Sequence, residues 1–435
     1  MNRRAFLAGV AASVAAAPGF TARSAAAETS RLETFLDWQR ASRDARDRAL
    51  TAAVGRIREL DETIHAWVQV APEKATGSGA LASIPFGVKD IIETRGLPTE
   101  YGSPIYKGRI GTVDAAIVRD LRGRGGVVMG KTHTTSFAYR TPAPTRNPRD
   151  LAHTPGGSSS GSAAAIAAGM VPVALGTQTG GSVLRPASFC GITGFKPTYG
   201  LLPMDGVLPF AKSLDTLGLF THTAADMIAL WEAIGHSTGR VEEFAVAAAD
   251  PLPKVEPPMA AAFTQTIARL RSAGVAITPI DIVAMLDELV AANHTIMFYE
   301  GARFHEQRYK EYGDRLADMA ALVREGLRIT GDTYDRARRV VDRSRTRVAE
   351  IYKATPVILV PAATGPAPLG LASTGDSSMN ASWTALGTPA MTIPMPITNG
   401  LPLGLQLTAA HGDEGRLLRT AVKLESLMHR SAEKE

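Results

Sequence analysis

Two glycine- and serine-rich stretches decide how this chain folds: PGGSSSGSAAAIAAGM at residues 155–170 and GTQTGGS at residues 176–182. The small helix formers at 162–169 predict a short helix, because alanine has the highest intrinsic helix propensity. The apolar run at 171–175 predicts a buried strand after it. The two stretches therefore place hydroxyl groups at the start of a helix and at the end of the next strand.

The rest of the chain predicts an α/β protein around this centre. The 435 residues are 45% hydrophobic, which is enough apolar content to bury a large core. Strand and helix patterns mix throughout, no repeat is evident, and no Pro/Gly-rich linker divides the chain. We therefore expect a single large domain with a mixed central β-sheet covered by helices on both faces. Strands are expected at 84–92, 127–129, 171–175, 357–360, 390–393 and 403–408, and helices at 30–60, 113–124, 162–169, 260–352 and 412–428.

The first residues have the layout of an export signal. Two arginines at 3–4 precede an apolar run at 6–17, and the alanines at 25–27 fit a small-residue cleavage site. Paired arginines indicate the twin-arginine route. We predict a cleaved signal peptide at 1–27, a mature domain at 28–435, and a periplasmic or secreted location without stable membrane insertion. An uncleaved anchor or an ordinary N-terminal helix is the alternative.

Charge and cysteine content exclude several classes of protein. The net charge is +5 without a clustered basic stripe, which argues against nucleic-acid binding. Cys190 is the one cysteine in the sequence, so neither an intrachain disulfide nor a cysteine-rich metal site can form. The histidines lack metal-ligand spacing. We therefore predict no metal and no cofactor.

Two familiar motifs match the sequence by letter but not by context. The string GGVVMGKT at 125–132 fits a P-loop, yet Val-Val-Met has the composition of a strand, so no loop remains to hold phosphates. The string GSSSG at 157–161 fits the nucleophile elbow of α/β-hydrolases, but the preceding 149–155 segment does not resemble a strand. A nucleotide site and a Ser-His-Asp triad are therefore the weaker hypotheses.

A third pattern combines a lysine with both serine clusters. Lys89 ends the apolar strand of PFGVKD, and Ser158 and Ser182 lie in the two glycine-rich stretches. Together with their flanks, these segments resemble the amidase signature family. The resemblance is dense from 85 to 235, thin to about 354, and weaker afterwards. The segments that carry it are 85–90, 130–132, 147–148, 155–170, 176–182, 189–191, 194–200, 387–390 and 401–406.

The resemblance implies a serine nucleophile assisted by a lysine. Ser182 would attack an amide carbonyl, Ser158 would relay the proton, and Lys89 would accept it as general base. A cis peptide bond between Gly157 and Ser158 is also implied. A free lysine has a pKa of ~10.4, so the base must be neutralised by burial. Asp90 follows it directly, but alternation along a strand should point Asp90 to the opposite face.

The second glycine-rich stretch is suited to stabilise an oxyanion. Successive backbone N–H groups of Thr179, Gly180, Gly181 and Ser182 can converge on one oxygen, because glycine allows the required backbone angles. Stabilising the developing negative charge is a major need of amide cleavage. We therefore expect the oxyanion hole here.

Two departures from the family pattern bear on the substrate. Gln178 stands where many members have an acidic residue. Arg185 lies three residues after Ser182, where an arginine two residues after is commoner. Arg185 could grip a substrate carboxylate with its planar fork, or form a structural salt bridge. Ser159, Gln178, Asn380 and Trp383 are further tentative substrate-binding residues, and the thinly matching stretch at 241–354 is expected to form part of the pocket wall.

The sequence thus predicts an amidase that hydrolyses a small acid amide through an acyl-enzyme. An amidotransferase-type subunit that works with a partner is one alternative, and a non-catalytic amide-binding protein is another. The intact Lys89, Ser158 and Ser182 argue against the binding protein. A homodimer remains open.

Overall fold

The computed structural model describes residues 32–75, 78–240 and 244–430. The export signal that the sequence predicts at 1–27 lies outside the described residues and stays a prediction. Within the described ranges, no helix has both the length and the apolar character needed to cross a bilayer.

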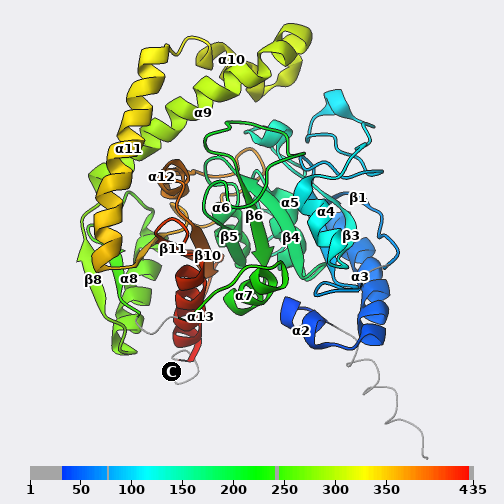
Figure 1. Cartoon of the computed structure of the whole chain (residues 1–435), viewed down its shortest axis with the longest axis horizontal. Coiled ribbons are helices and arrows are strands. Elements are labelled where there is room, and N and C mark those ends of the chain that lie inside the picture. Colours follow the sequence, from blue (N-terminus) through cyan, green and yellow to red (C-terminus); the bar gives the residue numbers. More distant parts are fainter. Residues whose placement is uncertain (1–31, 76–77, 241–243, 431–435) are drawn as a thin grey trace, which may run out of the picture. The chain divides into compact units, whose positions relative to one another are not determined.

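One mixed β-sheet forms the centre of the described chain (Figure 1). Its eleven strands lie in the order β1-β3-β2-β4-β6-β5-β10-β11-β9-β7-β8. The strands are β1 Trp67–Val70, β2 Pro85–Lys89, β3 Val127–Thr132, β4 Val173–Gln178, β5 Thr193–Lys196, β6 Thr216–Thr221, β7 Val246–Ala249, β8 Ile277–Ile280, β9 Val357–Pro361, β10 Ala390–Pro394 and β11 Gly404–Ala409. Most are fully buried, which explains why they are short continuous apolar runs and not alternating ones.

The order of the strands brings the Lys89 segment close to the second glycine-rich stretch. Strand β2 pairs in parallel with β4, with Val88 opposite Leu175. The carboxyl ends of parallel neighbours meet at the same edge of a sheet. Lys89, the last residue of β2, therefore lies beside the loop that follows Gln178 at the end of β4.

Helices cover both faces of the sheet, as the sequence predicts. On β10, the Thr392 hydroxyl faces α6 and donates to the Leu184 carbonyl, so Met391 and Ile393 face the other side by alternation. The α-helices are α2 Phe35–Arg40, α3 Arg43–Ile64, α4 Ala116–Gly123, α5 Ser160–Ala167, α6 Leu184–Cys190, α7 Ala224–Ala233, α8 Pro257–Ser272, α9 Val283–Tyr312, α10 Asp318–Gly326, α11 Gly331–Ala354, α12 Ser378–Leu386 and α13 Glu414–Arg430. The 3₁₀ turns are η1 Pro104–Tyr106, η2 Ser136–Ala138 and η3 Gly313–Leu316.

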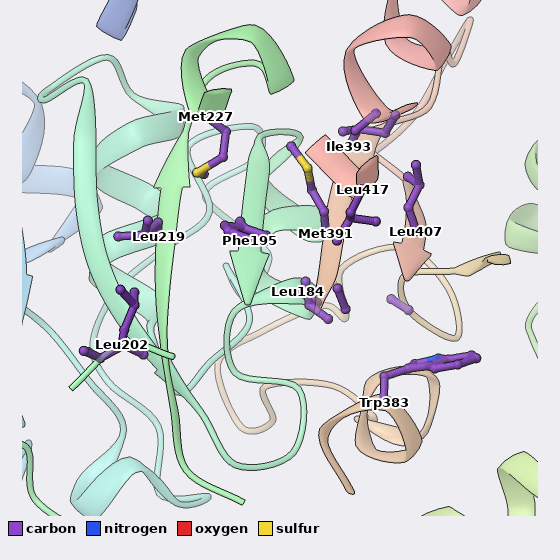
Figure 2. Close-up of a cluster of buried hydrophobic side chains, with 14 of the residues drawn as sticks. Leu184, Phe195, Leu202, Leu219, Met227, Trp383, Met391, Ile393, Leu407 and Leu417 are labelled. Carbon is purple, nitrogen blue, oxygen red and sulfur yellow. The ribbon is translucent and has the colours of Figure 1, made fainter. Parts of the chain in front are cut away.

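Buried apolar side chains from neighbouring strands fill the space between sheet and helices. Figure 2 shows this core, including Leu219 of β6, Phe195 of β5, Met391 of β10 and Leu407 of β11. These four strands are consecutive in the sheet. The apolar layer is thus continuous across the middle of the sheet and gives the strand ends a rigid support.

Helix α5 packs unusually close to the sheet because its residues are small. A Cβ atom at Gly161 would collide with the Ala66 carbonyl oxygen and the His133 nitrogen. The Ser162 hydroxyl instead reaches β4 and donates to the Leu175 carbonyl at 2.8 Å. Glycine, serine and alanine at these positions therefore set the distance between the first serine cluster and the sheet.

The prediction that residues 260–352 are mostly helical is confirmed, but the sequence did not show where this range divides into separate elements. The structure resolves it into α8, the short strand β8, α9, η3, α10 and α11. Figure 1 shows α10 and α11 at different parts of α9, and each packs against that helix. Strand β8 was missed because four residues are too few for a periodic signal.

The P-loop string does not form a phosphate-binding loop. Val127–Thr132 is strand β3, so the backbone groups of the variable residues belong to the sheet. The prediction that no loop remains to hold phosphates is confirmed.

Candidate active site

Lys89 is buried at the carboxyl end of β2 and points toward the first serine cluster. Its Nζ atom donates to Ser158 Oγ at 2.7 Å and to Thr177 Oγ1 at 2.8 Å. The side chain has no exposed surface. Burial holds the pKa of Lys89 well below its ordinary value, while the negative charge of Asp215 opposes this shift. The site thus favours an uncharged amine next to a hydroxyl group.

Asp90 faces different neighbours, as strand alternation predicts. Its carboxylate accepts hydrogen bonds from the backbone of Glu100 and Gly102 and lies 3.7 Å from Lys131 Nζ. Burial raises the pKa of Asp90 to about 6, against the charge of Lys131. Because Asp90 is occupied elsewhere, it does not form an ion pair that would keep Lys89 protonated.

Ser158 is placed by the turn that precedes α5. The peptide bond from Gly157 to Ser158 is cis, as the family resemblance implies. The Ser158 carbonyl accepts from the Thr135 backbone N–H at 3.2 Å, and the Gly157 carbonyl accepts from Arg185 Nη2 at 2.7 Å. Both carbonyls of the turn are therefore fixed by contacts from other segments.

The loop between β4 and α6 is held by side chains on several sides. Gln178 Oε1 accepts from the backbone N–H groups of Val183 and Leu184 at 2.9 and 3.1 Å. Asn293 Nδ2 donates to the Thr179 carbonyl at 3.1 Å. The Thr384 hydroxyl donates to the Gly180 carbonyl at 2.6 Å. The carbonyl side of this loop is thus occupied.

The N–H side of the same loop is free. In the described part of the chain, the backbone N–H groups of Gly180, Gly181 and Ser182 have no hydrogen-bond partner. Glycine at 181 is required by packing, since a side chain there would collide with the Asn380 amide. Free donors at adjacent positions have the chemistry of an oxyanion-binding site.

A cavity of about 300 Å³ opens above these groups. Ser158 and Ser182 both line it, although no hydrogen bond joins the two serines among the described residues. The segment at 374–378 forms one wall. Another wall is formed by the stacked rings of Tyr139 and Phe210, whose centroids are 5.6 Å apart. The cavity is therefore large enough for a small molecule in contact with both hydroxyl groups.

One face of α9 completes the cavity. Val290, Asn293, His294 and Met297 line it, and their spacing of three, four and seven residues places them on one side of a helix. The expectation that the thinly matching stretch forms part of the wall is met here. Sequence reasoning missed these four residues, although their helical spacing was a usable signal.

Four of the tentative substrate-binding residues do not line the cavity. The Gln178 side chain binds within the loop and not toward the cavity: its Oε1 accepts from the loop backbone, and its Nε2 donates to Thr384 at 3.0 Å. Ser159 exchanges hydrogen bonds with the Thr177 backbone. Asn380 donates to Ala362 and Gln406, and Trp383 is fully buried in the core (Figure 2). Each of the four side chains is enclosed by protein, and their contact with a substrate stays a prediction.

Arg185 lies in the cavity wall and also serves the fold. Its Nη2 donates to the Gly157 carbonyl at 2.7 Å and to Thr374 Oγ1 at 3.2 Å. Its buried Nε has no partner among the described residues. Burial lowers the pKa of Arg185 to about 10, which the charge of Asp376 partly opposes. The structural salt bridge that the sequence suggested is replaced by hydrogen bonds to a carbonyl and a hydroxyl.

The other reactive groups considered do not compete for this role. Burial raises the pKa of the Cys190 thiol to about 12, which disfavours the thiolate needed for nucleophilic attack. Across the described ranges, no group of three or more His, Cys, Asp or Glu side chains is arranged to bind a metal ion.

Comparison with known proteins agrees with this geometry. The family described as Amidase matches residues 48–418. The chain therefore belongs to the Amidase family, and the prediction made from the serine and lysine motifs is confirmed.

Curated relatives include the glutamyl-tRNA(Gln) amidotransferase A subunit from several organisms. The protein from Halothermothrix orenii is 30% identical over 444 residues, covering 86% of this chain and 92% of that protein. The one from Akkermansia muciniphila is 32% identical over 446 residues, covering 84% and 93%. The match to the Chromohalobacter salexigens protein is 43% identical but spans 205 residues, 42% of each chain.

Solved structures with this fold include an amidotransferase component as well as amidases. The glutamyl-tRNA(Gln) amidotransferase A subunit of Thermotoga maritima has a TM-score of 0.78 at 28% identity, covering 90% of this chain and 94% of that one. The native peptide amidase of Stenotrophomonas maltophilia has a TM-score of 0.74 at 27% identity, covering 87% and 93%. The same fold thus occurs both in an amidotransferase subunit and in a peptide amidase.

Proposed function

We propose that this protein hydrolyses a carboxamide through an acyl-enzyme on Ser182. The observation that carries the proposal is the buried Lys89 amine, which lies 2.7 Å from the Oγ atom of Ser158. Ser158 and Ser182 both line the cavity. An amine kept out of water is uncharged at a much lower pH than a free lysine, so it can accept a proton.

The steps follow from this arrangement. Ser182 Oγ attacks the carbonyl carbon while its proton passes to Ser158 and the proton of Ser158 passes to Lys89 Nζ. The free N–H groups of the Gly180 loop receive the developing oxyanion. The C–N bond then breaks as the nitrogen takes a proton back along the relay, and ammonia or an amine leaves. Water repeats the attack on the ester, releases the carboxylate and restores Ser182.

The cavity wall favours a small acid amide with a negatively charged group. Arg185 and Arg140 both line the cavity, opposed by the carboxylate of Asp376. Arg185 has a buried Nε that is unused by the protein, which supports its role as a partner for a substrate carboxylate. Comparing neutral with carboxylated amides in Arg185→Leu tests this. A loss restricted to carboxylated substrates supports the clamp, and an equal loss on both contradicts it.

A component of an amidotransferase is the second candidate, because the curated relatives carry that name. Both candidates share amide cleavage and differ in the fate of the ammonia. Purification of the full chain from its own host, followed by an assay for amide hydrolysis by the isolated chain, separates them. Turnover by the chain alone supports the amidase. Activity that appears only with a co-purifying protein supports the amidotransferase.

We also propose that residues 1–27 direct twin-arginine export. The arginine pair and the small-residue site support this location, and a periplasmic enzyme would not share a compartment with aminoacyl-tRNA. Fractionation of cells that express the full chain, with Arg3→Lys and Arg4→Lys as the matched variant, tests the route. Export of both forms alike contradicts it.

The test of the catalytic proposal uses a fluorophosphonate probe, which labels activated serines. We expect labelling of the mature protein at Ser182, loss of labelling in Ser182→Ala, and strongly reduced labelling in Lys89→Met. Persistent labelling at another serine in Ser182→Ala would contradict the assignment.

A further inference from the structure

We infer that Asp215 is a positioning residue of the proposed hydrolase, which holds the Ser182 loop through Thr179 and applies a negative charge to Lys89. This inference rests on the proposed function. Asp215 lies next to β6, outside both glycine-rich stretches, and is almost completely buried. It contacts neither reacting hydroxyl, so its effect must pass through other groups.

The first link runs from Asp215 to the loop that carries the nucleophile. Thr179 Oγ1 donates to Asp215 Oδ1 at 2.6 Å. On its other side, the Thr179 carbonyl accepts from Asn293 Nδ2 of α9 at 3.1 Å. Thr179 is thus held at two points, and the free N–H groups begin at the next residue. The charge-assisted hydrogen bond that Thr179 donates to the buried carboxylate is the stronger of the two contacts.

The second link fixes Asp215 itself and reaches the cavity. Asp215 Oδ2 accepts from the backbone N–H groups of Phe210 and Ala211 at 2.7 and 3.0 Å. Phe210 lines the cavity. One carboxylate therefore joins a cavity wall to the loop of the proposed oxyanion hole, and these two segments come from different parts of the chain.

The third link is electrostatic. The Asp215 charge opposes the fall in the pKa of Lys89 that burial causes. Asp215 is itself affected, since burial raises its pKa to about 6 and Glu300 of α9 adds to this. Lys212 and Asp205 line a second cavity together with Asp215. In this environment the ionised carboxylate makes Lys89 easier to protonate.

Asp215→Asn separates the charge from the contacts. Asparagine has the same shape, can still accept from Phe210 and Ala211 through its oxygen, and can donate to Thr179 Oγ1. Without the negative charge the protonated form of Lys89 loses stabilisation, so its pKa falls. We expect the acid limb of the kcat/KM profile to move to lower pH, on the order of one unit, with kcat reduced and KM little changed.

Thr179→Val and Thr179→Ser test the positional part separately. Valine removes the hydroxyl group and keeps the shape, so we expect kcat to fall on the order of tenfold while the acid limb moves less than in Asp215→Asn. Serine restores the donor and should restore most of kcat. This pair keeps the inference testable even if Asp215→Asn does not fold.

Two results would overturn the inference. One is an acid limb in folded Asp215→Asn that matches the wild type, and the other is equal kcat in Thr179→Val and Thr179→Ser. Failure of the proposed function is distinguishable, because the wild-type protein would then show neither amide turnover nor labelling at Ser182.

Discussion

The two glycine-rich stretches and the helical segment α9–α11 contribute to one cavity in different ways. The first region holds Lys89, Ser158 and the Ser182 loop through buried hydrogen bonds, between side chains at Lys89 and to the backbone elsewhere. The second contributes one face of α9, and no residue of α10 or α11 is in the cavity lining. The proposed reacting groups and the α9 part of the cavity wall are thus held by different contacts, except at Asn293, which lines the cavity and also donates to the Thr179 carbonyl. Substitutions in the first region should therefore affect the rate, and those in the second should affect the choice of substrate.

Removal of the nucleophile should have the largest effect. Ser182→Ala leaves no group to form the acyl-enzyme, so we expect kcat to fall by about 10⁴-fold or more. Steady-state amide hydrolysis, with substrate binding measured by calorimetry, checks this. Binding should persist because the cavity wall is unchanged. A loss of less than about tenfold would contradict the role of Ser182.

Replacement of the base should be nearly as severe and should change the pH profile. In the proposed mechanism the rate requires neutral Lys89, so wild-type kcat/KM should fall as pH drops through the lowered pKa of this lysine. Lys89→Met should lower kcat by about 10³-fold and abolish that acid limb. Lys131→Met is the matched control at a buried lysine whose Nζ atom donates to the Ile92 carbonyl and the Thr99 hydroxyl and not to Ser158. An acid limb that survives in Lys89→Met would contradict the assignment.

The close approach of α5 to the sheet predicts a stability effect. Gly161→Ala introduces a Cβ atom against the Ala66 carbonyl and should lower the free energy of unfolding by about 1–3 kcal/mol. Gly55→Ala is the control, because a Cβ atom in α3 meets nothing within 4 Å and should stabilise by about 0.5–1 kcal/mol. Urea denaturation monitored by circular dichroism measures both. Equal effects would contradict the packing argument.

The smallest effect should come from the α9 face. Met297→Ala enlarges the cavity, so we expect KM for a given amide to change by about three- to tenfold while kcat for a very small amide stays within about twofold. Glu288→Ala, on an exposed position of the same helix, is the control. If Met297→Ala lowered kcat for every amide alike, the separation of the two regions would fail.

Much of the fold and the central site could be predicted from the sequence. The strands expected at 84–92 and 171–175 are present as β2 and β4, and alternation along β2 correctly separated Asp90 from Lys89. These predictions succeeded because they depend on local periodicity and on recognisable segments.

The substrate wall could not be predicted, for a physical reason. The spacing of Val290, Asn293 and Met297 shows that they share a helix face, but not what that face contacts. The prediction that Asn380 and Trp383 bind substrate meets the opposite difficulty, because it rested on position in the sequence alone. They lie close to a family motif in the sequence, yet α12 buries them in the core.

The bond from Asn293 to the Thr179 carbonyl limits how this protein can be engineered. A graft of α9 from a relative would exchange the four lining residues that this helix contributes to the cavity. The graft would also remove a support of the nucleophile loop unless the donor amide were retained at that single position. Substrate selectivity can therefore be redesigned along α9 as long as Asn293 is kept to support the Ser182 loop.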